Sequence, residues 1–83
     1  MIKLKNVLDI VPEWQVIMLE IEFIYCEIET VTGTKNNDSI TAWDASIVHE
    51  IRSDNDNLYI HAVVIPAETE EEKEQIYKEW KEG

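Results

Sequence analysis

The chain is poor in the residues that mark several common protein classes. Of its 83 residues, one is cysteine, two are glycine and two are proline. The lone Cys26 excludes an intramolecular disulfide, and its position among apolar residues predicts a buried thiol rather than a reactive one. The length of 83 residues and the 45% share of hydrophobic residues predict a single small folded domain over residues 1–83.

Long apolar segments are also lacking. No run approaches the length of about 18 residues that a membrane-spanning helix requires. The first residues do not combine a basic segment with an apolar one, as a secretory leader would. We therefore expect no contact with a membrane and a cytoplasmic location.

Basic residues are scarce. Eighteen acids stand against seven bases, a net charge of −11, and between Asn6 and Glu72 the only bases are Lys35 and Arg52. Direct binding of nucleic acid is disfavoured, because phosphate contacts require Lys and Arg. A basic protein surface would instead attract this chain. The alternative, that the acidity only keeps the protein in solution, remains open.

Catalytic and metal-binding motifs are absent from the sequence. Cys26, His49 and His61 occur without a recognisable nucleophile–base arrangement, and no second His or Cys stands at metal-ligand spacing. The acids are expected in rows on open faces rather than as pairs inside a pocket. We predict that the protein is not an enzyme and uses no cofactor or metal ion.

The most informative segment is a strand predicted over about residues 15–31. Its apolar residues alternate through Ile17, Leu19, Ile21 and Phe23, and then the alternation shifts by one position. Either a β-bulge absorbs one residue or a tight turn separates two strands. Because no Gly, Asn, Asp or Pro lies there, we favour one long, bulged strand.

A single bulged strand would place four glutamates in one outward row, with Tyr25 among them. Outward residues two apart lie about 6.6 Å from each other along a strand, so the row would be a ladder of negative charges. The glutamates are Glu20, Glu22, Glu27 and Glu29.

The segments on either side of this strand have simpler patterns. A helix over about residues 2–11 follows from the apolar spacing of Leu4, Val7, Leu8 and Val11. Trp14 is predicted to pack at the start of the strand. A polar loop over about 33–39 leads to residues 39–45, which are equally compatible with a helical turn and an extended segment.

A hairpin is predicted over about residues 46–65. Its loop is Asp54–Asn57, since Asp and Asn favour turns, and counting outward places Ser53 opposite Leu58 and Glu50 opposite His61. The same count places His49 on the apolar face.

The last element is a helix over about residues 69–82. Thr69 is its expected cap, and Ile76, Tyr77 and Trp80 form a narrow apolar stripe. The elements together predict an α+β fold, a curved antiparallel sheet of three to four strands with an N-terminal and a C-terminal helix.

Two stretches give the chain a resemblance, the opening I-K-L-K-N-V-L-D-I-V-P and the hairpin D-N-D-N-L-Y-I. They resemble short proteins encoded by bacteriophages and mobile elements. Very acidic domains of this size among them are similar to anti-CRISPR proteins, several of which act as nucleic-acid mimics against a CRISPR effector nuclease. The resemblance lies in size, charge and general sequence character, and it assigns a role to no individual residue.

Two functions follow as expectations. The first is an inhibitor that covers a basic, nucleic-acid-binding groove of a partner protein such as a CRISPR effector nuclease. The second is a structural or assembly module, a homodimer or adaptor, with incidental acidity. The expected partner-binding acids are Glu20, Glu22, Glu27, Glu29, Glu70, Glu71 and Glu74, and the expected interface aromatics are Tyr25, Tyr77 and Trp80.

Overall fold

A computed structural model describes residues 1–24 and 26–83, with the backbone alone of Asp54. Over these residues the chain forms three helices, separated by two pairs of consecutive strands. In order they are α1 (Leu4–Leu8), β1 (Val16–Phe23), β2 (Ile28–Gly33), α2 (Asp38–Thr41), β3 (Ile47–Asp54), β4 (Asn57–Val64) and α3 (Glu70–Glu82). The predicted α+β class, with one small domain and a helix near each end, is confirmed.

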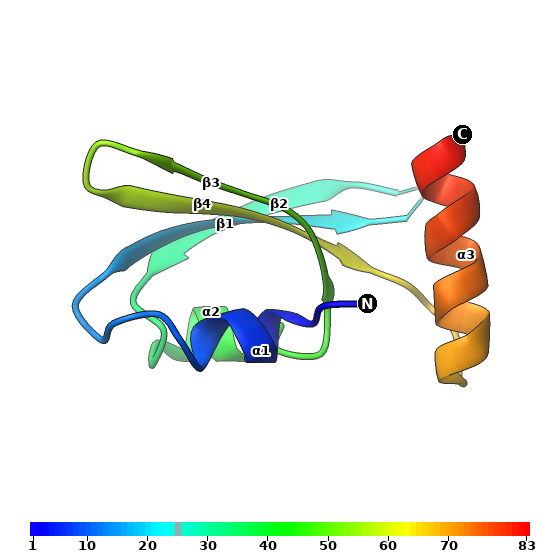
Figure 1. Ribbon diagram of the computed structural model, residues 1–83, viewed down its shortest axis with the longest axis horizontal. Helices are drawn as coiled ribbons and strands as arrows, with labels where there is room; N and C mark the ends of the chain where they lie inside the picture. Colours follow the sequence, from blue (N-terminus) through cyan, green and yellow to red (C-terminus); the bar gives the residue numbers. More distant parts are fainter. Residues whose placement is uncertain (25) are drawn as a thin grey trace.

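The four strands form one mixed sheet in the order β2-β1-β4-β3. The β1–β2 and β3–β4 pairs are antiparallel, whereas β1 and β4 run parallel, so the expectation of a wholly antiparallel sheet was wrong. Parallel neighbours need a long connection, and here β2, α2 and β3 all lie between them in sequence. Figure 1 shows α1 and α2 together on one side of the sheet and α3 across one end of it.

The main core lies between the sheet and the two short helices. The predicted stripe of Leu4, Val7, Leu8 and Val11 is buried against β1 and β4. The helix itself is shorter than predicted, because the chain before it pairs with β3: Lys3 bridges Ile47. The backbone groups near Lys3 form hydrogen bonds with β3, so they are not available for the hydrogen bonds of a longer helix.

The one-position shift in the apolar alternation after Phe23 corresponds to a hairpin turn rather than a bulge. The prediction of a single long strand over about residues 15–31 was therefore wrong. Strands β1 and β2 pair antiparallel, with Glu22 opposite Ile28 and Ile17 opposite Gly33. The Phe23 N–H donates to the Glu27 carbonyl at 2.8 Å and closes the turn. Turns of this length are often built on conformations that suit most residues, so glycine is not required.

The segment that the sequence left open forms the short helix α2. Its start is capped by Asn37, whose Oδ1 accepts a hydrogen bond from the Ser39 N–H at 3.0 Å. Ile40 is fully buried and fixes the helix against the core. The short helix carries the chain from β2, at one edge of the sheet, toward β3 at the other.

A β-bulge does occur, but it lies in β3. The predicted pairs of Ser53 with Leu58 and Glu50 with His61 are confirmed, and the register then shifts between Val48 and Glu50. The loop is shorter than expected, because Asp54 pairs with Asn57 and only Asn55 and Asp56 remain in the turn. Asn55 has a positive φ of 54°, which two-residue hairpin turns favour.

Helix α3 packs on the face of the sheet opposite to α1 and α2. A second, smaller core there contains Ile47, Val63 and Ile65, which contact the predicted stripe of the helix. The Thr69 Oγ1 accepts a hydrogen bond from the Glu72 N–H at 3.1 Å, as the predicted capping requires. No residue of α3 is fully buried, so a few partly buried contacts hold it in place.

Two side chains predicted to be buried are exposed. Cys26 lies in the β1–β2 turn, where the change of direction removes it from the apolar alternation. Trp14 precedes β1 and is 75% exposed. Both expectations depended on extending the pattern of β1 beyond its ends.

Candidate functional site

The four glutamates of the long segment do not form one row. Glu20 and Glu22 alternate with the buried residues of β1, so they lie on the α3 face of the sheet. Glu29 pairs with the buried Ile21 and lies on the opposite face, and Glu27 lies in the turn between the strands. The predicted ladder is therefore wrong, because the hairpin reverses the chain between its two halves.

Glu22 is the strand glutamate with a role inside the fold. Its Oε2 accepts a hydrogen bond of 2.9 Å from the Trp80 Nε1, and its Oε1 lies 3.1 Å from the His61 Nε2. The Glu22 side chain is 22% exposed. Charged hydrogen bonds of this kind are stronger than neutral ones, so Glu22 fastens the C-terminal half of α3 to the sheet.

Two imidazole rings and two aromatic rings surround the Glu22 carboxylate. We call these five residues the docking cluster: Glu22, His49, His61, Tyr77 and Trp80. The His49 ring meets the Trp80 ring edge-on with centroids 4.7 Å apart, and Tyr77 stacks with Trp80 at 5.9 Å. The Tyr77 hydroxyl lies 3.2 Å from the His49 Nδ1. Burial raises the pKa of Tyr77 above its usual value of 10.0. These contacts attach α3 to β1, β3 and β4 together.

Several residues of the docking cluster lie in positions that differ from those predicted from the sequence. Tyr77 and Trp80, expected at an interface with a partner, are half-buried within the chain. The bulge turns His49 away from the apolar face, so that its ring contacts His61 with centroids 5.3 Å apart. Tyr25, the third expected aromatic, lies outside the described residues. Sequence patterns gave no sign of this cluster, because the parallel pairing of β1 with β4 creates it.

The exposed carboxylates concentrate on α3. Glu70, at its first turn, accepts a hydrogen bond of 2.9 Å from the Lys3 Nζ and lies 3.9 Å from the Lys73 Nζ. The hydrogen bond from Lys3 is the main cause that lowers the pKa of Glu70 below its usual 4.5. We call the exposed glutamates of this helix the acidic face of α3: Glu70, Glu71, Glu72, Glu74, Glu79 and Glu82.

Few basic residues neutralise this face. Helix α3 carries six glutamates and three lysines, and its first five residues hold four of the glutamates. Over the described residues, Glu71 and Glu74 form no ion pair within 4.0 Å. The helix N-terminus tolerates acids well, yet that preference does not require so many. The expected site residues Glu70, Glu71 and Glu74 are thus brought together, apart from the strand glutamates.

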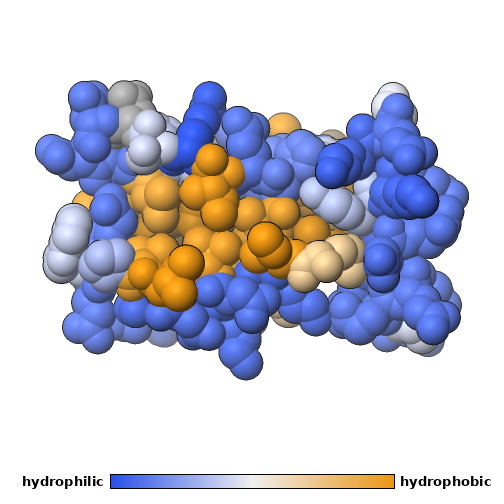
Figure 2. Space-filling model, viewed as in Figure 1, coloured by the Kyte–Doolittle hydropathy of each residue, from blue (hydrophilic) through white to orange (hydrophobic). Residues whose placement is uncertain are grey.

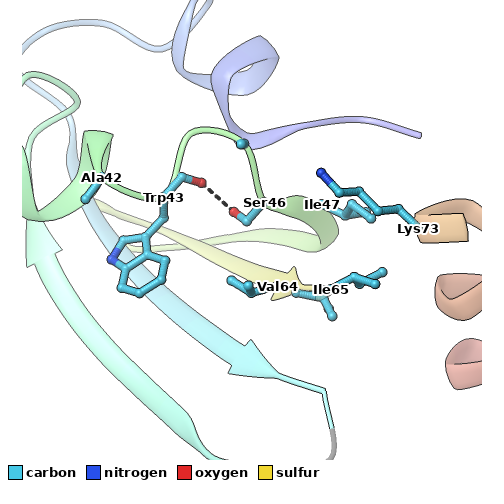
Figure 3. Close-up of a pocket in the computed structure, with 9 residues that line it drawn as sticks. Ala42, Trp43, Ser46, Ile47, Val64, Ile65 and Lys73 are labelled. Carbon is cyan, nitrogen blue, oxygen red and sulfur yellow. Dashed lines mark hydrogen bonds between the residues drawn. The ribbon is translucent and has the colours of Figure 1, made fainter. Parts of the chain in front are cut away.

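A cavity of about 250 Å³ lies beside the start of α3. Figure 3 shows Trp43, Ile47 and Ile65 along its wall and Lys73 entering from the helix. The Ser46 hydroxyl donates to the Trp43 carbonyl and stabilises the turn that forms the upper wall. The lining is mostly apolar and holds one titratable side chain, Lys73, so it does not provide the acid–base pair that hydrolytic chemistry needs.

In the described part of the chain, no three His, Cys, Asp or Glu side chains gather in a group that could hold a metal ion. None of the helices that the structure describes is long and apolar enough to cross a membrane.

Comparison with known proteins gives no assignment. No protein family, curated protein or solved structure that was searched matches this chain. The acidic face of α3, the docking cluster and the surface of the sheet are therefore the features from which a function can be inferred.

Proposed function

We propose that this protein is a non-enzymatic, cytoplasmic binding protein whose acidic surface covers a basic, nucleic-acid-binding groove of a partner protein. In this role it would act as an anti-CRISPR-like inhibitor of a CRISPR effector nuclease. The observation that supports this proposal is the acidic face of α3, which presents six exposed glutamates against three lysines at one end of the molecule.

The geometry of a helix suits this role. Each turn of an α-helix rises about 5.4 Å, so glutamates on successive turns present negative charges at regular spacing. Glu71 and Glu74 lie one turn apart and are both exposed. A groove lined with Lys and Arg to receive phosphates would attract such a series of charges.

The way in which α3 is attached to the rest of the domain also favours binding. A charged surface binds more tightly when little conformational freedom is lost on binding. The Glu22–Trp80 hydrogen bond holds the C-terminal half of the helix, and the Lys3–Glu70 pair links its first turn to the N-terminal segment. The acidic face is therefore presented by a helix that is linked to β1 near its C-terminal end and to the N-terminal segment at its first turn.

The test is displacement of a labelled DNA duplex from a guide-loaded CRISPR effector nuclease. Wild type should displace the duplex, and its binding should weaken steeply between about 50 mM and about 200 mM salt, as for phosphate-binding grooves. Replacing Glu71, Glu72 and Glu74 together by Gln should weaken displacement about tenfold or more, since three contacts within one site are lost.

Two control variants with the same change in net charge locate the effect. Asp9→Asn, Glu13→Gln and Asp44→Asn together neutralise exposed acids around α1 and α2. Glu20→Gln, Glu27→Gln and Glu29→Gln together test the strand glutamates, which the hairpin divides between two faces. Either control should alter displacement by less than about twofold, because long-range charge effects are screened. Equal losses in all three variants would show that only total charge matters, and no displacement by wild type would remove this partner class.

A second function, a structural or assembly module, is favoured by a different surface. Figure 2 shows hydrophobic side chains gathered in the middle of one face, between α1 and the β3–β4 hairpin, with hydrophilic side chains around them. The chain around these elements carries the exposed Ile2, Ile10 and Ile51. Contiguous exposed apolar surface often marks an interface between proteins.

A further inference from the structure

Strand β3 has an outer edge that the rest of the chain covers only at its beginning. The Val48 N–H donates to the Ile2 carbonyl at 2.8 Å, next to the bridge between Lys3 and Ile47. In the described part of the chain, the backbone hydrogen bonds to this outer edge end at Val48. An edge left open in this way is a template for another strand.

The hairpin geometry identifies which backbone groups point outward. Asp54 and Asn57 close a two-residue turn, so this pair exchanges backbone hydrogen bonds. Bonded and non-bonded pairs alternate along an antiparallel ladder. Arg52 is then a bonded residue, and Ile51 and Ser53 direct their N–H and C=O groups away from β4.

The side chains at this position are self-complementary. Ile51 is 46% exposed, and its two neighbours carry opposite charges, Glu50 and Arg52. If two β3 strands paired antiparallel about Ile51, Glu50 of each chain would lie opposite Arg52 of the other. Such pairs would be the non-hydrogen-bonded type, in which facing side chains are closest.

We infer that β3 is the interface of a homodimer, in which two copies pair antiparallel about a two-fold axis at Ile51 and join their sheets edge to edge. The exposed Ile2 lies beside this edge, since its carbonyl accepts the Val48 hydrogen bond, so each copy would add apolar surface next to the other. The occupant is a second copy rather than a different protein, because the register that pairs Ile51 with itself also pairs both charges. This inference deepens the assembly function and is independent of the acidic face of α3.

The net charge gives the dimer a distinctive response to salt. Each copy carries −11, so the two repel one another at low ionic strength, and added salt screens that repulsion. The dimer should therefore become tighter between about 0.15 M and about 1 M salt. Binding through the acidic face of α3 should become weaker over the same range, so the two proposals fail independently.

Sedimentation of charge variants tests the register. Glu50→Arg alone places two Arg–Arg pairs across the axis, and Arg52→Glu alone places two Glu–Glu pairs there. Each should raise the dimer Kd about tenfold or more. An equimolar mixture of these two variants restores both opposite-charge pairs and should form a heterodimer about as tight as wild type, a result that loss of folding cannot imitate.

Covalent trapping tests the axis itself. Paired residues of the bonded type have Cα atoms about 5.5 Å apart, a distance that a disulfide can span. In a Cys26→Ser background, Ile51→Cys should form a disulfide-linked dimer under mild oxidation. Ile28→Cys in the same background is the control, since Ile28 is at least as exposed as Ile51 and lies on the other edge strand, β2.

Each outcome decides the inference. Rescue by the mixture together with cross-linking at Ile51 alone would support it. Wild type that stays monomeric up to about 1 mM at both salt concentrations would overturn it, because association weaker than about −4 kcal/mol has no structural role. A dimer unaffected by either charge variant would also overturn it, since β3 would then lie outside the interface.

Discussion

The Trp80 Nε1 donates a 2.9 Å hydrogen bond to the Glu22 Oε2, which joins α3 to the inner strand β1 across 58 positions of the chain. Because no residue of α3 is fully buried, this bond and the rings around it largely determine where the helix lies. The same helix carries the acidic face. The Glu22 carboxylate therefore contributes, together with the apolar contacts of α3, to the position of the proposed functional surface.

Glu22→Ala should release the C-terminal half of α3. It removes the acceptor of two hydrogen bonds and leaves the Trp80 indole unpaired, which should reduce the free energy of unfolding by about 1–3 kcal/mol. Urea denaturation measures the loss, and faster amide exchange in α3 than in β4 locates it. Glu20→Ala, at an exposed position on the same strand face, should change the stability by less than about 0.5 kcal/mol. Equal effects would contradict the role of Glu22.

Tyr77 should make the attachment of α3 sensitive to alkaline pH. Burial raises its pKa above 10.0, so the fold favours the neutral phenol. This contribution to stability is fully present below pH 10 and is lost as the pH rises through the folded-state pKa. Absorbance of the ionised phenol should show a late-titrating tyrosine that is missing in Tyr77→Phe. The loss of α3 protection above pH 10 should be smaller in that variant.

Glu70 should titrate at unusually low pH for an exposed glutamate. The Lys3 hydrogen bond lowers its pKa below 4.5, so its contribution is present above that pH and is lost as the pH falls through the folded-state pKa. Carboxyl NMR shifts follow this titration directly. Lys3→Met should raise the midpoint toward 4.5 and leave the helix capped by Thr69. An unchanged midpoint would mean that Lys3 and Glu70 do not interact in solution.

Two substitutions distinguish the observed hairpin from a single long strand. Leu19→Ala should reduce the free energy of unfolding by about 2–5 kcal/mol, because Leu19 is fully buried and leaves a cavity. Ile28→Ala should cost less than about 0.5 kcal/mol, since Ile28 is 55% exposed in β2. In a single bulged strand, the shifted apolar alternation after Phe23 would have placed Ile28 in the core. A large loss at Ile28 would therefore support the single strand.

Much of the local structure could be read from the sequence. The stripe of Leu4, Val7, Leu8 and Val11, the cap at Thr69 and the pairing of Ser53 with Leu58 all depend on residues close together in the chain. Short-range periodicity, capping and turn chemistry determine such features. They predicted the α+β class and the C-terminal helix.

The features that failed each required a choice between local alternatives. The one-position shift in the apolar alternation after Phe23 was compatible with either a bulge or a turn. The segment that forms the turn contains no residue type with a strong turn preference. The bulge in β3 had no signal of its own, because His49 fits either face until the Trp80 and Tyr77 rings are beside it. In both places a contact distant in sequence decided between two acceptable local structures.

The amino-acid sequence alone determined the charge of −11, the amphipathic stripes and the concentration of glutamates over residues 68–82. These are properties of composition and spacing, which folding does not change. The tertiary structure decided which glutamates act together. The hairpin separates Glu29 from Glu20, the parallel pairing of β1 with β4 brings Glu22 to His61, and α3 covers Glu22 while presenting its own acids. Which strand lies next to which is a long-range choice, and no local pattern records it.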